Sequence, residues 1–238
     1  MRHPCGVKRS RRRTAVSWSG GKDSALALWK AKSGGLSVEY LLNTVRCESD
    51  RVAFHGVRSG LIKKQADLLE LPLLQKRVGD DDYKERFLEA LDELANKGIT
   101  TVVFGDIDVE QNRAWCESVC REAGIEPYFP LWSRDQRGLI REFIDSGFKA
   151  VVVAVDSSYF DKSVLGTSLD DAWLGLIEGK RSSGTSLTYC GENGEYHTFV
   201  TSGPNFKSRI KLLETRKSIR DGFGQLDVVR FEVAPRRS

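Results

Sequence analysis

Apolar runs and amphipathic segments alternate through the first half of the chain. The runs are rich in branched and aliphatic residues and predict buried strands at 14–17, 38–45, 73–78, 100–107 and 126–131. Between them, apolar positions at helical spacing predict helices at 23–32, 59–69, 81–96 and 110–123. This alternation is typical of a doubly wound parallel sheet. We therefore predict a Rossmann-like α/β fold, in which a ligand binds outside the carboxyl ends of the strands.

The alternation changes near Ser133. Beyond it the pattern predicts a helix at 136–146, a buried strand at 150–155, a short helix at 170–178 and a polar loop at 179–194. Two β-like stretches within 206–233 flank Asp221-Gly222-Phe223-Gly224 and predict an antiparallel hairpin. We therefore predict a main domain over 14–132 and a second, smaller α/β subdomain over 133–238.

Charge is concentrated at the start of the chain. The 238 residues carry a formal net charge of +4, but six lysines and arginines lie within the first thirteen residues. We interpret residues 1–13 as a disordered basic tail; an arm for nucleic acid or an anionic surface is the alternative. No run of about eighteen apolar residues is present, which excludes a membrane span, and no secretory signal is recognisable. Five scattered cysteines agree with a reducing, cytoplasmic location.

A glycine-containing loop follows the first predicted strand and precedes a helix. It reads Ser17-Trp18-Ser19-Gly20-Gly21-Lys22-Asp23-Ser24. Its glycines let the backbone approach an anion, and the start of the helix points its positive end at the same place. Lys22 adds a mobile positive charge, and Ser19 and Ser24 add hydroxyl groups. The spacing differs from a Walker A loop, but together these groups predict a pyrophosphate site.

The string Ser-Gly-Gly-Lys-Asp-Ser resembles the signature of the ATP pyrophosphatase, or PP-loop, superfamily. The resemblance implies that ATP is cleaved between its α and β phosphates to AMP and pyrophosphate. It implies attack on the α-phosphate by a substrate oxygen, followed by displacement of AMP by a second nucleophile. Mg²⁺ would offset the phosphate charge. On this resemblance Ser17 and the loop from Ser19 to Ser24 bind ATP.

A second polar motif reads Cys190-Gly191-Glu192-Asn193-Gly194-Glu195-Tyr196-His197-Thr198-Phe199-Val200. It gathers two carboxylates, a tyrosine, a histidine and a threonine within seven residues. Such a group is suited to holding magnesium, orienting ammonia or accepting a proton. A polar surface turn that leads into a strand is the alternative interpretation.

This second motif resembles the Gly-Glu-x-Gly-Glu-Tyr/Phe-His-Thr signature of the diphthine–ammonia ligase family, and Gly203-Pro204-Asn205-Phe206 continues the likeness. That family amidates diphthine, a modified histidine of a translation elongation factor, with ATP and ammonium. The resemblance extends over about residues 14–206. Phe104-Gly105-Asp106-Ile107 is more similar to a bacterial-type branch, which implies an acceptor other than diphthine.

The resemblance and the residue types together suggest roles for individual side chains. Lys22, Glu192, Glu195 and His197 are expected to be catalytic, and His55, Gly191, Glu192, Tyr196 and Thr198 to bind the acceptor. Asp106, at the carboxyl end of a buried strand, is expected near ATP and as a Mg²⁺ ligand; capping the next segment is the alternative. Lys207 and Arg209 suit an acceptor carboxylate or an exposed strand.

These observations predict an ATP-dependent amide ligase that adenylates a carboxylate-bearing acceptor, a small molecule or a protein side chain, and amidates it with ammonia or ammonium. Two alternatives remain: a tRNA-modifying PP-loop enzyme, and an ATP-binding sensor without turnover. We expect neither a membrane nor a nucleic acid as partner, and a homodimer is one assembly that the sequence allows.

Overall fold

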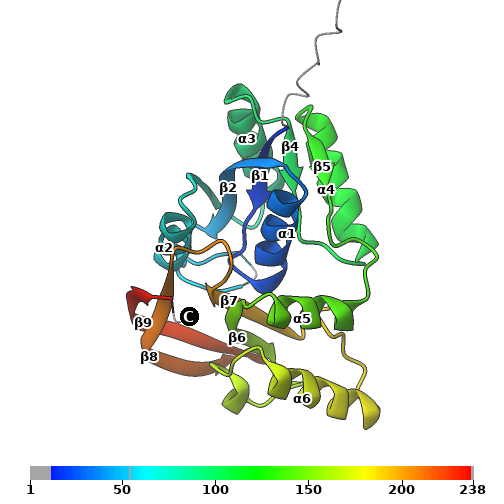
Figure 1. Ribbon diagram of the computed structural model, residues 1–238, viewed down its shortest axis with the longest axis vertical. Coiled ribbons are helices and arrows are strands. Elements are labelled where there is room, and N and C mark those ends of the chain that lie inside the picture. The colour runs from blue at the N-terminus through cyan, green and yellow to red at the C-terminus, as the bar shows by residue number, and fades with distance from the viewer. Residues whose placement is uncertain (1–11, 54, 237–238) are drawn as a thin grey trace, which may run out of the picture.

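The computed structural model describes residues 12–53 and 55–236, so the predicted basic tail lies outside the described residues except for its last two (Figure 1). The elements of the N-terminal half are β1 (Arg13–Ser17), α1 (Lys22–Ser33), β2 (Ser37–Arg46), α2 (Ser59–Leu69), β3 (Leu73–Val78), α3 (Tyr83–Asn96), β4 (Thr101–Val103), α4 (Glu110–Glu122) and β5 (Glu126–Tyr128). Among the described residues, no helix combines the length and apolar character that crossing a membrane requires.

The first sheet is parallel throughout and has the strand order β3-β2-β1-β4-β5. Alternation along each strand sends neighbouring side chains to opposite faces. Val16 packs with α1 and α2 on one face, whereas Ala15 packs with α3 and α4 on the other. The predicted doubly wound α/β sheet is therefore confirmed. Its strand order reverses direction between β1 and β4, which is where such sheets bind ligands.

The second half forms an antiparallel sheet with the order β7-β6-β9-β8. Its elements are α5 (Gln136–Asp145), β6 (Lys149–Asp156), a short 3-10 helix (Lys162–Val164), α6 (Asp171–Ser182), β7 (Tyr196–Ser202), β8 (Ser208–Arg220) and β9 (Phe223–Pro235). The predicted hairpin is β8–β9, and its turn residues Asp221 and Gly222 both have positive φ. Two such residues suit a two-residue turn between twisted strands.

The predicted strand at 100–107 is wrong in its second part. β4 ends at Val103, which pairs with Val16 as the last pair between β4 and β1. β1 continues only to Ser17 before the glycine loop begins, so the residues after Phe104 have no partner strand on that side; the Phe104 amide still donates to the Tyr128 carbonyl of β5 at 2.9 Å. Gly105 instead lies against the start of α1, where an added Cβ would be 2.9 Å from the carbonyl carbon of Asp23. The segment that follows β4 therefore leaves the sheet beside the glycine loop.

Two boundaries in the second half also differ from the prediction. The helix expected at 170–178 continues to Ser182, so the expected loop at 179–194 begins one turn later. Asp170 caps this helix by accepting hydrogen bonds from the N–H groups of Ala172 and Trp173. Tyr196, His197 and Thr198 of the second motif follow the predicted loop and lie in β7.

Apolar and polar contacts join the two halves. One continuous buried cluster contains Val16 and Leu41 from the first sheet and Val152 and Phe199 from the second. At the edge of this junction, the Asp227 carboxylate on β9 accepts hydrogen bonds from Arg51 at 2.8 Å and from Arg58 at 2.8 and 2.5 Å. These charged bonds connect the hairpin with the segment before α2.

We predict that Asp227→Asn lowers the free energy of unfolding by about 1–2 kcal/mol, because two charge-assisted contacts with partly exposed arginines are lost. The melting temperature should fall by about 2–6 °C in thermal denaturation at pH 7.

The two arginines hold the pKa of Asp227 well below its usual value of 3.8. Its stabilisation is therefore present above about pH 4 and lost as the pH falls. The variant should lose this part of the acid dependence of stability. An identical acid dependence in both proteins would contradict the assignment; Asp221→Asn, at the exposed turn, is the control.

Candidate functional site

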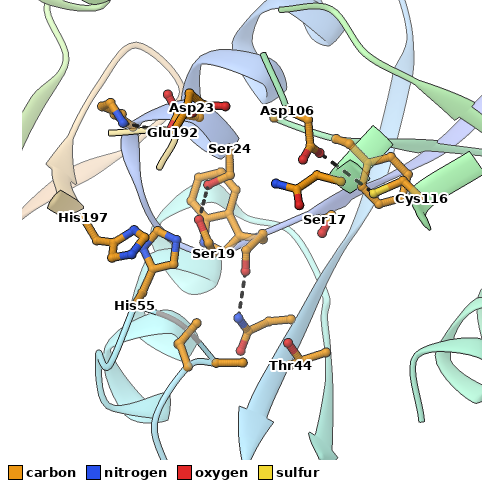
Figure 2. Close-up of a pocket in the computed structure, with 18 of the residues that line it drawn as sticks. Ser17, Ser19, Asp23, Ser24, Thr44, His55, Asp106, Cys116, Glu192 and His197 are labelled. Atoms are coloured by element: carbon orange, nitrogen blue, oxygen red, sulfur yellow. Dashed lines mark hydrogen bonds and ion pairs between the residues drawn. The ribbon is translucent and has the colours of Figure 1, made fainter. Parts of the chain in front are cut away.

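A cavity of about 630 Å³ lies where the carboxyl ends of β1, β2 and β4 meet the second sheet. Figure 2 shows its polar wall, with the glycine loop at the centre and residues of both halves around it. The loop contributes Ser17, Ser19, Lys22, Asp23 and Ser24 to the lining. From the second motif, Gly191, Glu192, Tyr196, His197 and Thr198 line the same cavity. The two motifs, about 170 residues apart in the sequence, therefore share one site.

The glycine loop requires both of its glycines. Gly20 has a φ of +82°, and a Cβ on it would lie 2.5 Å from a methyl carbon of Ile62. A Cβ on Gly21 would lie 2.9 Å from the His55 ring. Within the loop the hydroxyls of Ser19 and Ser24 lie 3.3 Å apart (Figure 2), and the Ser24 hydroxyl also bonds to the Gly21 carbonyl. The backbone is thus closely packed, and the first turn of α1 lines the cavity at Lys22, Asp23 and Ser24; the start of a helix favours an anion.

A buried glutamine holds this loop in place, and sequence reasoning did not select it as a site residue. Gln65 donates to the carbonyls of Gly20 at 3.0 Å and Val200 at 2.7 Å, and accepts from the Trp18 indole at 2.9 Å. Its side chain is fully buried. The sequence did contain one indication of this role, since Gln65 is a polar residue on the apolar face of α2, between Ile62 and Leu69. A buried amide is tolerated there only if its hydrogen-bonding groups have partners.

Lys22 is buried at the meeting point of the two motifs. Its ammonium donates to the Asp23 carboxylate at 2.8 Å and to the carbonyl oxygen of Cys190, and lies 4.9 Å from the centre of the Tyr196 ring. Burial works against its charge, but Asp23 and the other negative groups outweigh it and raise the pKa of Lys22. The Lys22 amide also donates to the Thr198 hydroxyl at 3.0 Å. Lys22 is thus a fixed positive charge in the cavity.

Glu192 is a cavity carboxyl group with a strongly raised pKa. Burial, together with the negative charge of Asp23, raises its pKa to about 8, although Lys22 opposes the shift. A carboxyl group with this pKa exchanges a proton close to neutral pH, as a general acid or base requires. The backbone amide of Glu192 is held by the Thr188 hydroxyl at 2.8 Å, so the group is positioned by its own loop.

The structure separates Glu195 from Glu192. Glu195 is fully buried and does not line the cavity. Its oxygens accept from the Thr188 amide at 2.6 Å, the Thr188 hydroxyl at 3.1 Å and the Asn193 amide at 2.9 Å. This geometry does not support the catalytic role expected for Glu195. The residue instead fixes the turn that carries Glu192.

The two histidines lie side by side at one end of the cavity, with ring centres 4.5 Å apart (Figure 2). Burial lowers the pKa of His197 to about 4, and the charge of Lys22 adds to the shift. Burial also lowers the pKa of His55, with contributions from His197 and Lys22. Both rings are therefore neutral at pH 7 and suit hydrogen bonding better than proton uptake.

Tyr196 and Asp106, which the sequence also predicted as site residues, line the same cavity. The Tyr196 hydroxyl donates to the Tyr189 carbonyl at 2.6 Å, which commits it to the loop. Asp106 follows β4 and lines the cavity, and its carboxylate faces the Cys116 thiol at 3.9 Å. The residue before α4 is Val109, so Asp106 does not cap that helix. Burial raises the pKa of Asp106, and the negative charge of Asp23 adds to the shift.

Aromatic side chains form the far end of the cavity, which the sequence did not indicate. Tyr83 and Phe87 from α3 and Trp115 from α4 line it, with ring centres 5.0–6.3 Å apart. Flat apolar walls of this kind suit a planar ligand group. The cavity thus combines a phosphate loop at its centre with an aromatic wall at one end.

Two family models match successive parts of the chain. Residues 12–127 match the family model of the diphthamide synthase N-terminal domain, and residues 135–233 match that of the diphthamide synthase C-terminal domain. The chain belongs to the diphthamide synthase family. The resemblance to diphthine–ammonia ligases predicted from the two motifs is confirmed.

Relatives in the diphthamide synthase family carry a ligase name. The diphthine–ammonia ligases of Homo sapiens and Danio rerio are 28% and 30% identical to this chain. The matches cover 92% and 90% of this chain and 90% and 92% of those proteins. Such ligases depend on ATP and form a carbon–nitrogen bond, in agreement with the enzyme class predicted from the sequence. A solved structure, a predicted subunit of tRNA methyltransferase from Methanocaldococcus jannaschii, is 15% identical with a TM-score of 0.41, covering 79% of this chain and 95% of that one.

We predict that Gln65→Leu weakens ATP binding at least ~10-fold and lowers the free energy of unfolding by about 2–4 kcal/mol. The change leaves two carbonyls and an indole N–H without their partner and frees the glycine loop. Calorimetric titration with ATP and urea denaturation measure the two effects. Lys64→Ala, on the exposed side of the same helix, should change neither appreciably. Unchanged ATP affinity in Gln65→Leu would show that this residue does not determine the conformation of the glycine loop.

Proposed function

We propose that this protein cleaves ATP to AMP and pyrophosphate, adenylates an acceptor carboxylate and replaces AMP by ammonia to form an amide. The observation that carries the proposal is the shared cavity of Lys22 in the phosphate loop and Glu192 in the second motif. Lys22, which would bind the phosphates, therefore lines the same cavity as Glu192, which exchanges a proton near neutral pH. Activation and amidation of a carboxylate need both.

In the first step, an oxygen of the acceptor carboxylate attacks the α-phosphorus, and pyrophosphate leaves. The amides at the start of α1, the hydroxyls of Ser19 and Ser24 and the Lys22 charge would bind the phosphates and stabilise the departing negative charge. The aromatic wall would accommodate the adenine ring, because both are flat and apolar. Lys22 and the hydroxyls of Ser19 and Ser24 are held in the cavity by their own hydrogen bonds.

Magnesium fits the carboxylates of this cavity. Mg²⁺ is commonly held by one or two carboxylates together with substrate phosphates. Asp23 and Asp106 both line the cavity and disfavour each other's charge, which a cation would relieve. Within the part of the chain that the structure describes, no group of three or more His, Cys, Asp or Glu side chains forms a protein-only metal site. When bound, Mg²⁺ would offset phosphate charge.

In the second step, ammonia attacks the acyl carbon, AMP leaves, and the nitrogen gives up a proton. We assign the acceptance of this proton to Glu192, because the pKa of His197 is too low for the task at neutral pH. The neutral His55 and His197 rings would bind the acceptor by hydrogen bonds. A smaller cavity of about 210 Å³ adjoins both rings and is lined by the hairpin tip, including Arg220 and Phe223. This route assigns acceptor binding mainly to residues 133–238, with His55 as the contribution of the first half.

Nucleotide product analysis tests the reaction. The protein is incubated with ATP, Mg²⁺, ammonium and either pools of small carboxylic acids or an elongation factor bearing diphthine. We expect acceptor-dependent AMP and pyrophosphate, reduced at least ~100-fold in Lys22→Met because the buried charge that stabilises the leaving group is lost. Formation of ADP and phosphate would overturn the proposed cleavage. If the protein binds ATP but forms AMP with none of the acceptors, the alternative of an ATP-binding sensor without turnover would be favoured.

We predict that the amidation rate, measured at constant free ammonia, rises with pH through about 8 in the wild-type protein. Glu192 accepts a proton only as a carboxylate, and its raised pKa places that change near pH 8. Glu192→Gln should be slow and should lack this inflection while binding ATP normally. Glu126→Gln, which alters an exposed carboxylate outside the cavity, should keep the inflection. The same inflection in Glu192→Gln would remove Glu192 from the proton-transfer step.

A further inference from the structure

A second cavity, of about 570 Å³, lies in the antiparallel half of the molecule. Its walls are the ends of β6 and β7 and the first part of β8, with Leu226 of β9 and Arg236 at its margin. It shares no lining residue with the ATP cavity. The strands that carry its lining residues lie in the lower part of Figure 1.

The lining of this second cavity is positively charged. Lys149, Arg209, Lys211 and Arg236 line it, and none of its lining residues is acidic. Lys211 pairs with Glu232 at 2.9 Å, and Arg236 donates to two backbone carbonyls. Lys149 and Arg209 form no ion pair with any residue in 12–53 or 55–236. Two uncompensated cations therefore remain for a ligand.

Arg209 carries the most specific indication. Its Nε is buried, and no hydrogen-bond partner for it occurs among the described residues. A buried donor without a partner is destabilising, so natural proteins rarely leave one unsatisfied. A guanidinium group binds the oxygens of phosphate and carboxylate through paired N–H donors. The guanidinium of Arg209 lines the cavity, so an anion bound there would accept from its terminal N–H groups.

The other lining groups define the kind of anion. Ser202 and Thr215 add hydroxyl donors, which suit a group with several oxygens. Val151, Leu212 and Leu226 add apolar surface, and the volume exceeds that of a bare inorganic anion. We propose that this second cavity binds a phosphorylated organic molecule, with its phosphate on Arg209 and Lys149 and its apolar body against the aliphatic side chains.

The proposal is tested with phenyl phosphate as the probe and with the methyl groups of Ile, Leu and Val as reporters in NMR spectra. Saturable shifts are expected at Val151, Ile210 and Leu212. Leu42 and Val52, which line the ATP cavity, report any binding at the phosphate loop separately. The test is therefore independent of the proposed ligase activity.

Two substitutions address the anion contact. Arg209→Gln and Lys149→Gln should each weaken phenyl phosphate binding at least ~10-fold, because a charge-assisted hydrogen bond is lost. Lys207→Gln is the matched control, since Lys207 pairs with Glu70 at 3.3 Å and does not line the cavity. Lys149 is exposed, so its substitution remains informative if the Arg209 variant does not fold.

Three outcomes would overturn the proposal. The first is the absence of shifts at the three reporters. The second is a dissociation constant unchanged by both substitutions, or equal shifts with benzyl alcohol, which lacks the anion. The third is tighter binding of a single-stranded RNA oligonucleotide with the same shifts, which would assign the cavity to a nucleic-acid backbone.

Discussion

The docking of β7 against the glycine loop is the interaction on which the rest of the site depends. The Val200 amide donates to the Gly20 carbonyl at 2.9 Å, and the Thr198 hydroxyl accepts from the Lys22 amide. Gln65 bridges Gly20 and Val200 from a third direction. An edge strand of the antiparallel sheet thus provides hydrogen-bond partners for a loop of the parallel sheet. A phosphate loop that leaves its own sheet after Ser17 needs such partners, because its buried polar groups would otherwise remain unsatisfied.

The same docking explains the charge balance of the cavity. Bringing the second motif onto the loop buries Lys22 among Asp23, the Cys190 carbonyl and Tyr196. Burial of Glu192 in this junction, together with the negative charge of Asp23, raises the pKa of Glu192 to about 8, although Lys22 opposes the shift. Proton affinity in this site is therefore a consequence of assembly between the two halves. Neither motif alone would create it.

The sequence predicted the fold well because the signals for it are local. Strand and helix periodicity located the parallel sheet, and the exact helix at Ser59–Leu69 and strand at Leu73–Val78 show how far this extends. The extent of β4 was not predictable from the apolar run, because its end depends on where β1 leaves the sheet. Pattern recognition also grouped Glu192 with Glu195. Their separation depends on which carboxylate the Thr188 and Asn193 amides bind, and that is set by the folded turn.

The residues that sequence reasoning missed share a physical property. Gln65 and the aromatic group of Tyr83, Phe87 and Trp115 lie on amphipathic helices, where their spacing is the same as that of ordinary core residues. Periodicity reports that a side chain faces inward but not what it meets there. A glutamine on the apolar face of a helix can be recognised from the sequence, and it does indicate what the side chain contacts. An amide is buried only where it has hydrogen-bond partners. In a chain of this kind, a polar residue on the apolar face of the helix beside a phosphate loop is therefore informative about the loop itself.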